Sequence, residues 1–253
     1  MGNKRIGKTV QEVINKLGGI QFKGIHPLAE KDKIFYKERY ENIISLFPNI
    51  NDDNVGLEVG LSGGILAMSI KKYFNLDKLY AIEHPVTVKS FTSKYLKIIK
   101  EENIILKPFD LRKKPLPFVS EKFDFVILSE VLEHLVPADI PQVICEIIRV
   151  VKKDGYLFVT TPNISSFLKR INLLFGKNPI EFDLRLHYNA TFGHIREYTS
   201  KEVQRILSDC GFKILNKEFF NIDTNRNIFT RIEAISSKYY APFANNIFVL
   251  GQK

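Results

Sequence analysis

From Val55 onward, short apolar runs alternate with segments whose apolar residues recur at the spacing of an α-helix. The apolar runs cover residues 55–59, 79–82, 103–106, 123–128 and 156–160, and the helical spacing covers residues 65–74, 88–99 and 140–151. Strands that alternate with helices in this way predict an α/β fold, with a parallel sheet covered on both faces. Ligands of such folds bind beyond the carboxyl ends of the strands, so the residues that follow each strand are the first candidates for a site.

The chain before this region, residues 1–54, is predicted to form a helical leader or cap. Apolar residues recur at roughly helical spacing over residues 31–46, and Pro48 and an Asn-rich segment then break the helix. Residues 55–253 are predicted to form one domain, since α/β folds of about 200–250 residues are often single units. Its segment 164–192 has no clean period and is too long for an idle loop, which predicts a lid-like insertion over the site.

One more helix is expected near the end of the domain. Thr199–Glu202 matches a capping box, and Gly211 occupies the place of the glycine that follows a helix. We therefore expect a helix between these two signals, followed by strands near residues 212–215 and 246–250.

Composition excludes several classes of protein. The two cysteines are far apart, which excludes a disulfide-rich secreted scaffold, and 20 phenylalanines exclude intrinsic disorder. No apolar run approaches the roughly 18 residues of a transmembrane helix, and residues 1–11 lack the apolar segment of a signal peptide, so we expect a cytoplasmic protein. The net charge of +9 indicates an anionic partner such as nucleic acid, a membrane surface or a phosphorylated substrate.

Polar residues stand at the ends of four successive predicted strands. The first strand ends in the glycine-rich segment 58–64 directly before a helix, where small residues let a ligand approach the backbone. The second ends at Glu83, an acid that can accept hydrogen bonds from both hydroxyls of a ribose. The third leads to Asp110 and the fourth to residues 129–134. This coincidence is more informative than the glycine-rich turn alone, which fits a nucleotide site, a phosphate site or tight packing.

These motifs occur in the order and spacing of class I S-adenosylmethionine-dependent methyltransferases, which the sequence resembles over residues 55–215. The pieces that carry the resemblance are EVGLSGG, YAIEH, ILKPFDLRKKPLPF, EKFDFVILSEVLEHL, IIRVVKKDGYLFVTTPN and GHIREYTSKEVQRILSDCGF. One departure is Ser62, which stands at the place of the family's middle glycine. The resemblance implies a Rossmann-like, doubly wound sheet of seven strands, mostly parallel with an antiparallel C-terminal strand. It also implies S-adenosyl-L-methionine as the cofactor and S-adenosyl-L-homocysteine as its product.

Carried over residue by residue, the resemblance implies a cofactor site at the strand ends. The residues implied to surround the methionine part and the sulfonium are Glu58, Gly60, Ser62, Gly64, Ser129 and Glu130. The residues implied to hold the ribose and the adenine are Glu83, His84, Asp110 and Leu111. A cofactor with a positive sulfonium suits a pocket that is lined by carboxylates and otherwise apolar.

Histidines are the candidates for acid–base chemistry. Methyl transfer is an in-line displacement that depends on positioning, and a hydroxyl acceptor also needs a general base. His194 follows the expected lid, in a stretch that borders the acceptor pocket of the resembling enzymes, so it is the first candidate; its alternative is to hold the lid in place. His134 is the second candidate, and its alternative is a structural hydrogen bond across the strand–helix turn. His26, His84 and His187 complete the set.

Other chemistries have less support. No Cys-x-x-Cys or His-Glu-x-x-His occurs, so we expect no metal site. The P-loop pattern and the Gly-x-Ser-x-Gly of hydrolases are absent too. The expected acceptor is a small polar molecule, with an oxygen of a sugar or similar metabolite first and carbon or nitrogen second. An RNA-binding protein or RNA methyltransferase, and a non-catalytic cofactor-binding member of the fold, are the alternatives.

The positive charge lies largely outside the expected cofactor site. Up to Ile50 the leader holds nine Lys and Arg against five Asp and Glu, a net charge of +4, whereas acids stand at the strand ends. This distribution weakens the case for nucleic acid. It leaves a saccharide that is phosphorylated or membrane-borne as an anionic acceptor.

Overall fold

The computed structural model describes residues 2–18, 20, 30–113, 115–180, 193–222 and 227–253. Its strands form one seven-stranded sheet in the order β3-β2-β1-β4-β5-β7-β6. Their bounds are β1 Gly56–Val59, β2 Leu79–Glu83, β3 Ile104–Pro108, β4 Phe123–Ser129, β5 Val151–Pro162, β6 Lys213–Phe220 and β7 Asn246–Gln252. Strands β1 to β5 pair in parallel with one another, and β7 is antiparallel to both β5 and β6. The predicted α/β fold, mostly parallel with an antiparallel C-terminal strand, is confirmed.

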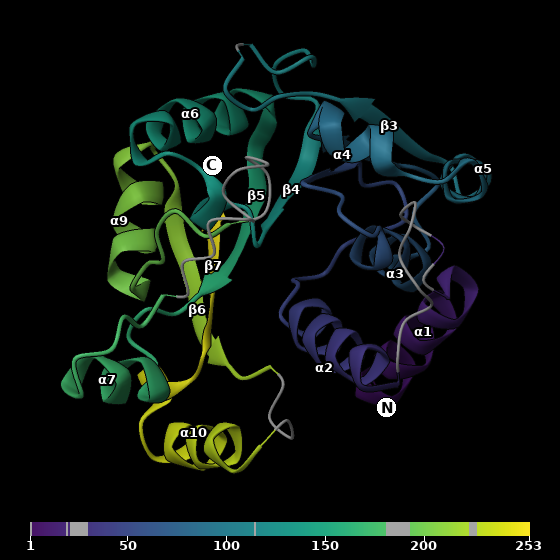
Figure 1. Cartoon of the computed structure of the whole chain (residues 1–253). Helices are drawn as coiled ribbons and strands as arrows, with labels where there is room; N and C mark the ends of the chain where they lie inside the picture. The colour runs from purple at the N-terminus through teal and green to yellow at the C-terminus, as the bar shows by residue number, and fades with distance from the viewer. Residues whose placement is uncertain (1, 19, 21–29, 114, 181–192, 223–226) are drawn as a thin grey trace.

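Helices cover both faces of this sheet, with α1, α2 and α3 on one side and α6 and α9 on the other (Figure 1). Their bounds are α1 Gly2–Leu17, α2 Glu30–Ser45, α3 Ile65–Phe74, α4 Pro85–Ser90, α5 Ser93–Glu101, α6 Ile140–Val150, α7 Phe167–Leu174, α9 Ser200–Asp209 and α10 Ile228–Tyr239. Successive β4 residues alternate between two apolar cores: Phe125 belongs to the core with α1, α3 and α5, and Val126 to the core with α6 and α9. This alternation follows from the period of two in a strand.

The helix expected over residues 88–99 is in fact two helices, α4 and α5. Phe91 takes an extended conformation, with φ −66° and ψ 144°, and its ring is buried in the core. Thr92 then caps α5, because its hydroxyl oxygen accepts a hydrogen bond of 3.0 Å from the backbone N–H of Tyr95. Apolar spacing alone predicted one helix here, since it does not register a side chain that competes for backbone hydrogen bonds.

Residues 153–155, whose Asp-Gly pair is typical of a turn, lie inside β5, which is longer than the apolar run over residues 156–160 predicted. Asp154 adopts a positive φ of 61°, and the register between β4 and β5 shifts between Phe123 and Phe125. The turn residues therefore mark an irregularity within a strand instead of its beginning.

The helix expected after residue 199 is α9, and its boundaries are as predicted. The Thr199 hydroxyl oxygen accepts from the backbone N–H of Glu202, and the Glu202 carboxylate accepts from the backbone N–H of Thr199. Gly211 follows the helix with φ 101°, a conformation that glycine adopts at low cost.

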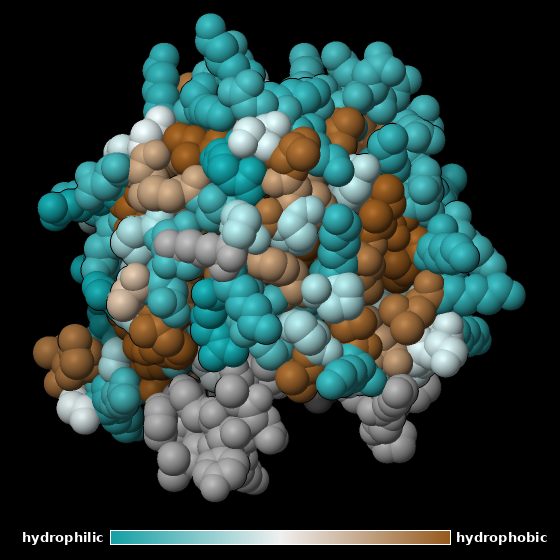
Figure 2. Space-filling view, turned by 90° about the horizontal axis from the view of Figure 1, so that it is seen from above, coloured by the Kyte–Doolittle hydropathy of each residue, from teal (hydrophilic) through white to brown (hydrophobic). Residues whose placement is uncertain are grey.

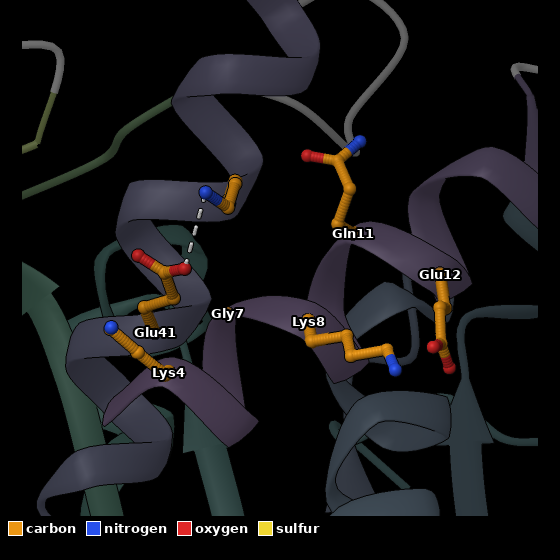
Figure 3. Close-up of a pocket in the computed structure, with 7 residues that line it drawn as sticks. Lys4, Gly7, Lys8, Gln11, Glu12 and Glu41 are labelled. Carbon is orange, nitrogen blue, oxygen red and sulfur yellow. Dashed lines mark ion pairs between the residues drawn. The ribbon is translucent and has the colours of Figure 1, made fainter. Parts of the chain in front are cut away.

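The leader contains α1 in addition to the expected helix, which is α2. The apolar residues of α1 are buried at spacings of one, three and four, a helical pattern that could have predicted it: Ile6, Val10, Val13, Ile14 and Leu17. Gly7 lets α2 approach closely, since a Cβ there would lie 2.2 Å from Oε1 of Glu41. Figure 3 shows the hollow between the two helices, where Lys37 pairs with Glu41 at 3.5 Å. Gly7 and this hollow therefore mark the face of α2 that packs against α1.

No helix among the described residues has both the length and the apolar character needed to cross a bilayer. On the face shown in Figure 2, hydrophilic side chains predominate and apolar ones lie between them in separate patches.

Candidate functional site

A cavity of about 680 Å³ lies beyond the carboxyl ends of β1 to β4. This volume is in the range of about 300–1,000 Å³ typical of small-molecule sites. The predicted site residues that line it are Glu58, Gly60, Ser62, Glu83, His84, Asp110, Leu111, Ser129, Glu130, His134 and His194. The structure therefore brings together side chains that are up to 136 positions apart, between Glu58 and His194.

The turn after β1 explains the glycine-rich segment. Ser62 adopts φ 48°, a left-handed conformation that favours glycine, and it stands where the family pattern has one. Gly64, with φ 70°, is the one predicted cofactor residue that does not line the cavity. A Cβ on Gly64 would lie 2.3 Å from the Tyr95 hydroxyl oxygen, so the packing of Tyr95 requires a glycine there.

Glu58 is the most deeply buried acid of the cofactor set. Glu58 lies at the end of β1 and is only 2% exposed. Its Oε2 atom has no hydrogen-bond partner among the described residues. Burial, followed by the nearby charge of Glu83, raises the pKa of Glu58 well above its usual value. A buried carboxylate oxygen without a partner is costly, so this position suits a ligand that brings a hydrogen-bond donor or a positive charge.

Glu83 is held at the end of β2 by two backbone groups. Its Oε2 atom accepts a hydrogen bond of 2.8 Å from the N–H of Ser62, and its Oε1 atom accepts one of 2.6 Å from the N–H of His84. Each carboxylate oxygen can accept a further bond, so the pair remains able to bind two neighbouring hydroxyls.

Asp110 is clamped by a residue that the sequence did not assign to the site. The guanidinium of Arg112 donates to both oxygens of Asp110, at 2.9 and 2.8 Å, and these bonds lower the pKa of Asp110 to about 2. His84 also lies near this carboxylate, with its Nε2 atom 3.9 Å from Oδ2 of Asp110. The sequence shows that Arg112 lies two positions after Asp110, but it does not show that two nitrogens of the guanidinium each bind one carboxylate oxygen.

The end of β4 carries a chain of polar contacts. The Ser129 hydroxyl lies 2.9 Å from that of Thr160, which donates to Oε1 of Glu130 at 2.9 Å. The other Glu130 oxygen pairs with Arg39 of α2 at 3.2 Å, and both side chains are about 15% exposed. Glu130 itself has φ 53°, a conformation that non-glycine residues rarely adopt outside functional or strained positions.

The leader contributes one wall of the cavity. Four α2 residues line it, and none of them was predicted as a site residue: Phe35, Tyr36, Arg39 and Tyr40. Their spacing over two turns places them on one face of the helix. The aromatic residues in this segment were visible in the sequence as helical spacing, but only the fold shows which face meets the cavity.

Both candidate histidines line the cavity and lie close to each other, with ring centroids 5.1 Å apart. The Nδ1 atom of His134 lies 3.0 Å from the carbonyl oxygen of Gly193, and the Nδ1 atom of His194 lies 3.1 Å from Oε1 of Glu197. The hydrogen bond with Glu197 raises the pKa of His194 against the opposing effect of burial.

Two acids beside these histidines were missed by the sequence reasoning. Glu133, next to His134 in the quoted SEVLEH segment, is wholly buried, and Glu197 is 6% exposed and also pairs with Lys169. Their burial depends on contacts between distant segments, which the sequence pattern does not show.

The expected lid over residues 164–192 is described only as far as residue 180. None of the described residues 164–180 lines the cavity, and α7 lies beside α10 (Figure 1). The rest of the expected lid, with His187, lies outside the described residues, as does His26.

Comparisons with known proteins agree with this architecture. The model of a family described as a methyltransferase domain matches residues 33–217, well over half of the chain. No curated protein sequence matches. Similar folds include an S-adenosylmethionine-dependent methyltransferase from Archaeoglobus fulgidus, at a TM-score of 0.57 and 15% identity over 89% of this chain and 95% of that one.

Two further structures have the same fold. A methyltransferase from Mesorhizobium loti, described as S-adenosylmethionine-dependent, matches at a TM-score of 0.56 and 13% identity, over 84% of this chain and 96% of that one. Phosphoethanolamine N-methyltransferase 2 from Haemonchus contortus, in complex with S-adenosyl-L-methionine, matches at 0.57 and 14% identity, over 85% of this chain and 52% of that one. With a family model over most of its length and this sheet order, the chain belongs to the methyltransferase domain family and has the fold of the class I S-adenosylmethionine-dependent enzymes.

Proposed function

We propose that the protein transfers a methyl group from S-adenosyl-L-methionine to an oxygen of a small polar acceptor, a sugar or a similar metabolite. The observation that carries the proposal is one cavity with carboxylates at successive strand ends and a histidine pair at its border. Membership of the methyltransferase domain family supports the reaction class.

The residues around the cavity fit this cofactor. The unpartnered oxygen of Glu58 suits the positive methionine end, and Ser129 and Glu130 lie at the neighbouring strand end. Glu83 would accept from the ribose hydroxyls, and Asp110, with His84 and the Leu111 backbone, would bind the adenine. When bound, S-adenosyl-L-methionine supplies an electrophilic methyl group on a positively charged sulfur.

His194 is the residue we assign to the acceptor proton. Its Nδ1 atom faces a carboxylate oxygen of Glu197, which accepts but cannot donate, so Nδ1 carries the hydrogen and Nε2 of the neutral ring is a free acceptor. Glu197 also stabilises the ring after protonation, because its charge and hydrogen bond favour the imidazolium. His194 can therefore accept the proton of a hydroxyl acceptor at Nε2, and His134 orients the segment that carries it through the carbonyl of Gly193.

The cavity favours a small acceptor over RNA. Its volume of about 680 Å³ has to hold the cofactor as well as the acceptor. Five carboxylates line it against two arginines, and both arginines are paired, Arg39 with Glu130 and Arg112 with Asp110. A phosphate backbone would need unpaired positive charge at this place.

Two experiments test the proposal: a calorimetric titration of cofactor binding and an assay of methyl transfer. S-adenosyl-L-homocysteine should bind with one site per chain, and a labelled methyl group should then move to hydroxyl acceptors in a panel of sugars and polyols, with RNA in parallel. If S-adenosyl-L-homocysteine does not bind, the cofactor assignment is overturned. Labelling of RNA alone would overturn the small acceptor and leave the cofactor site standing.

A further inference from the structure

We propose that Glu133, His134 and His194 bind a divalent transition-metal ion at the border of the cavity. Each residue offers one ligand atom, and these three atoms all lie within 4.8 Å of one another. All three residues line the cavity, so a molecule bound in the cavity could reach an ion that they hold.

The first observation is the state of Glu133. Glu133 is fully buried, and this burial raises the pKa of its carboxyl group. One carboxylate oxygen, Oε2, accepts a hydrogen bond of 3.1 Å from the Thr161 hydroxyl, whereas Oε1 has no hydrogen-bond partner among the described residues. Oε1 lies 4.0 Å from Nε2 of His134, so the unpartnered oxygen is turned toward the histidines.

The second observation is the orientation of the two rings. Nδ1 of His134 faces a carbonyl oxygen and Nδ1 of His194 faces a carboxylate oxygen, so each Nδ1 donates its hydrogen. In the neutral rings both Nε2 atoms then carry a free lone pair. Metal-binding histidines are held in this way, with the second ring nitrogen donating to a carbonyl or a carboxylate.

The third observation is that the backbone holds the two segments together. The carbonyl oxygen of Glu133 accepts hydrogen bonds from the N–H groups of Ile195, at 2.8 Å, and Arg196, at 3.3 Å. His194 is thereby fixed against the short helix η1, Leu132–His134, although it lies 60 positions along the chain. The spacing explains why no local motif predicted the ligand set.

The donor set selects the kind of ion. Two imidazole nitrogens and one carboxylate oxygen suit zinc and related transition metals, whereas magnesium and calcium prefer oxygen ligands alone. Bonds of about 2.0–2.2 Å place ligand atoms about 3 Å apart, so the side chains would close by about 1–2 Å around the ion. Three protein ligands leave at least one position open.

The open position gives the ion a role, and this part of the inference rests on the proposed function. With the ion bound, Nε2 of His194 is a ligand, so in the metal-bound protein the ion takes over the activation of the acceptor that His194 provides in the metal-free protein. An acceptor oxygen bound at the open position would be fixed beside the cofactor site, and the ion would lower the pKa of its hydroxyl group so that the proton can leave to water. The binding of the ion itself does not depend on methyl transfer, so it can be tested separately.

Cobalt(II) is the probe, because its visible absorption reports the ligands around it. The full-length protein is stripped with a chelator, and Cys145 and Cys210 are replaced by Ser in every sample, since free thiols would also bind cobalt. We expect one equivalent of cobalt with nitrogen and oxygen ligands. His194→Ala and Glu133→Gln should weaken binding by at least about tenfold.

His84→Ala is the matched control, because His84 also lies on the cavity beside a carboxylate but outside the ligand set. It should leave cobalt affinity unchanged. His194→Ala keeps the test valid if Glu133→Gln fails to fold, because His194 is partly exposed. No stoichiometric binding, or equal affinity in His194→Ala and the parent, would overturn the site.

The same samples separate the two proposals. If S-adenosyl-L-homocysteine binds and cobalt does not, the proposed function stands and the metal site is overturned. If cobalt binds and S-adenosyl-L-homocysteine does not, the metal site stands and the proposed function is overturned.

Discussion

The backbone N–H of Ser62 donates a hydrogen bond of 2.8 Å to Oε2 of Glu83, which ties the turn after β1 to the end of β2. Ser62 makes this bond from a left-handed conformation, with φ 48°. A side chain in that region costs about 1–2 kcal/mol, which glycine avoids. We expect Ser62→Gly to raise the free energy of unfolding by up to about 1 kcal/mol, the gain being reduced by the greater freedom of glycine in the unfolded chain.

Urea denaturation measures this difference. Ala67→Gly is the control, because Ala67 lies inside α3 and is buried, so glycine there should lower the free energy of unfolding by at least about 1 kcal/mol through lost helix propensity and a lost buried methyl group. If both variants lose the same stability, the backbone of Ser62 is not strained.

The acids at the ends of β2 and β3 should govern cofactor affinity. We expect Glu83→Ala and Asp110→Ala each to weaken S-adenosyl-L-homocysteine binding by at least about tenfold, since each removes a charged hydrogen-bond acceptor. Calorimetry measures the affinity, and circular dichroism checks the fold. Glu101→Ala, at the exposed end of α5, should change neither. Unchanged affinity in both site variants would defeat the assignment.

Glu58 should make the stability of the free protein depend on pH. Burial raises its folded pKa above the unfolded value of 4.5, so between these two values the native state binds more protons than the unfolded state. Its contribution therefore favours the native state below pH 4.5 and is lost as the pH rises through the folded pKa. Glu58→Gln should remove this loss.

Denaturation of both proteins at several pH values above 4.5, without cofactor, checks this prediction. The variant should gain stability over the wild type as the pH rises. Parallel curves for the two proteins would show that Glu58 has the same pKa folded and unfolded.

The ion pair between Arg39 and Glu130 should couple α2 to the sheet. Because both side chains are mostly buried, we expect a coupling of about 1–2 kcal/mol in a double-mutant cycle of Arg39→Ala and Glu130→Ala. The free energy of unfolding is the quantity to compare. Additive effects of the two substitutions would mean that the pair contributes nothing.

His194 should matter for turnover and not for the cofactor. With an acceptor from the panel, His194→Ala is expected to lower turnover by about 100-fold or more, the usual contribution of a positioned proton acceptor. Its affinity for S-adenosyl-L-homocysteine should stay within about twofold of the wild type. Full activity of the variant would remove His194 from the reaction.

Local patterns were enough to predict the parallel part of the sheet and most of the strand-end residues, whereas the antiparallel strand was implied by the family resemblance. Glu58, Glu83 and Asp110 were found because parallel strands bring their carboxyl ends to one edge, wherever they stand in the chain. The burial of Glu133 beside the two histidines could not be predicted in this way, because it results from contacts with Thr161 and the segment after Gly193. Spacing likewise showed that residues 31–46 are helical, but not which face of α2 would meet the cavity.

Two separate parts of the chain, α2 and the strand ends, contribute to the cavity. The strands and their turns supply the residues proposed for the cofactor, whereas Phe35 and Tyr36 on one wall come from a helix that precedes all seven strands. Substitutions in that helix can reshape the wall without altering any strand or its register. Under the proposed function, changes at Phe35 and Tyr36 can therefore alter the selectivity for the acceptor while the strand-end residues proposed for the cofactor stay the same.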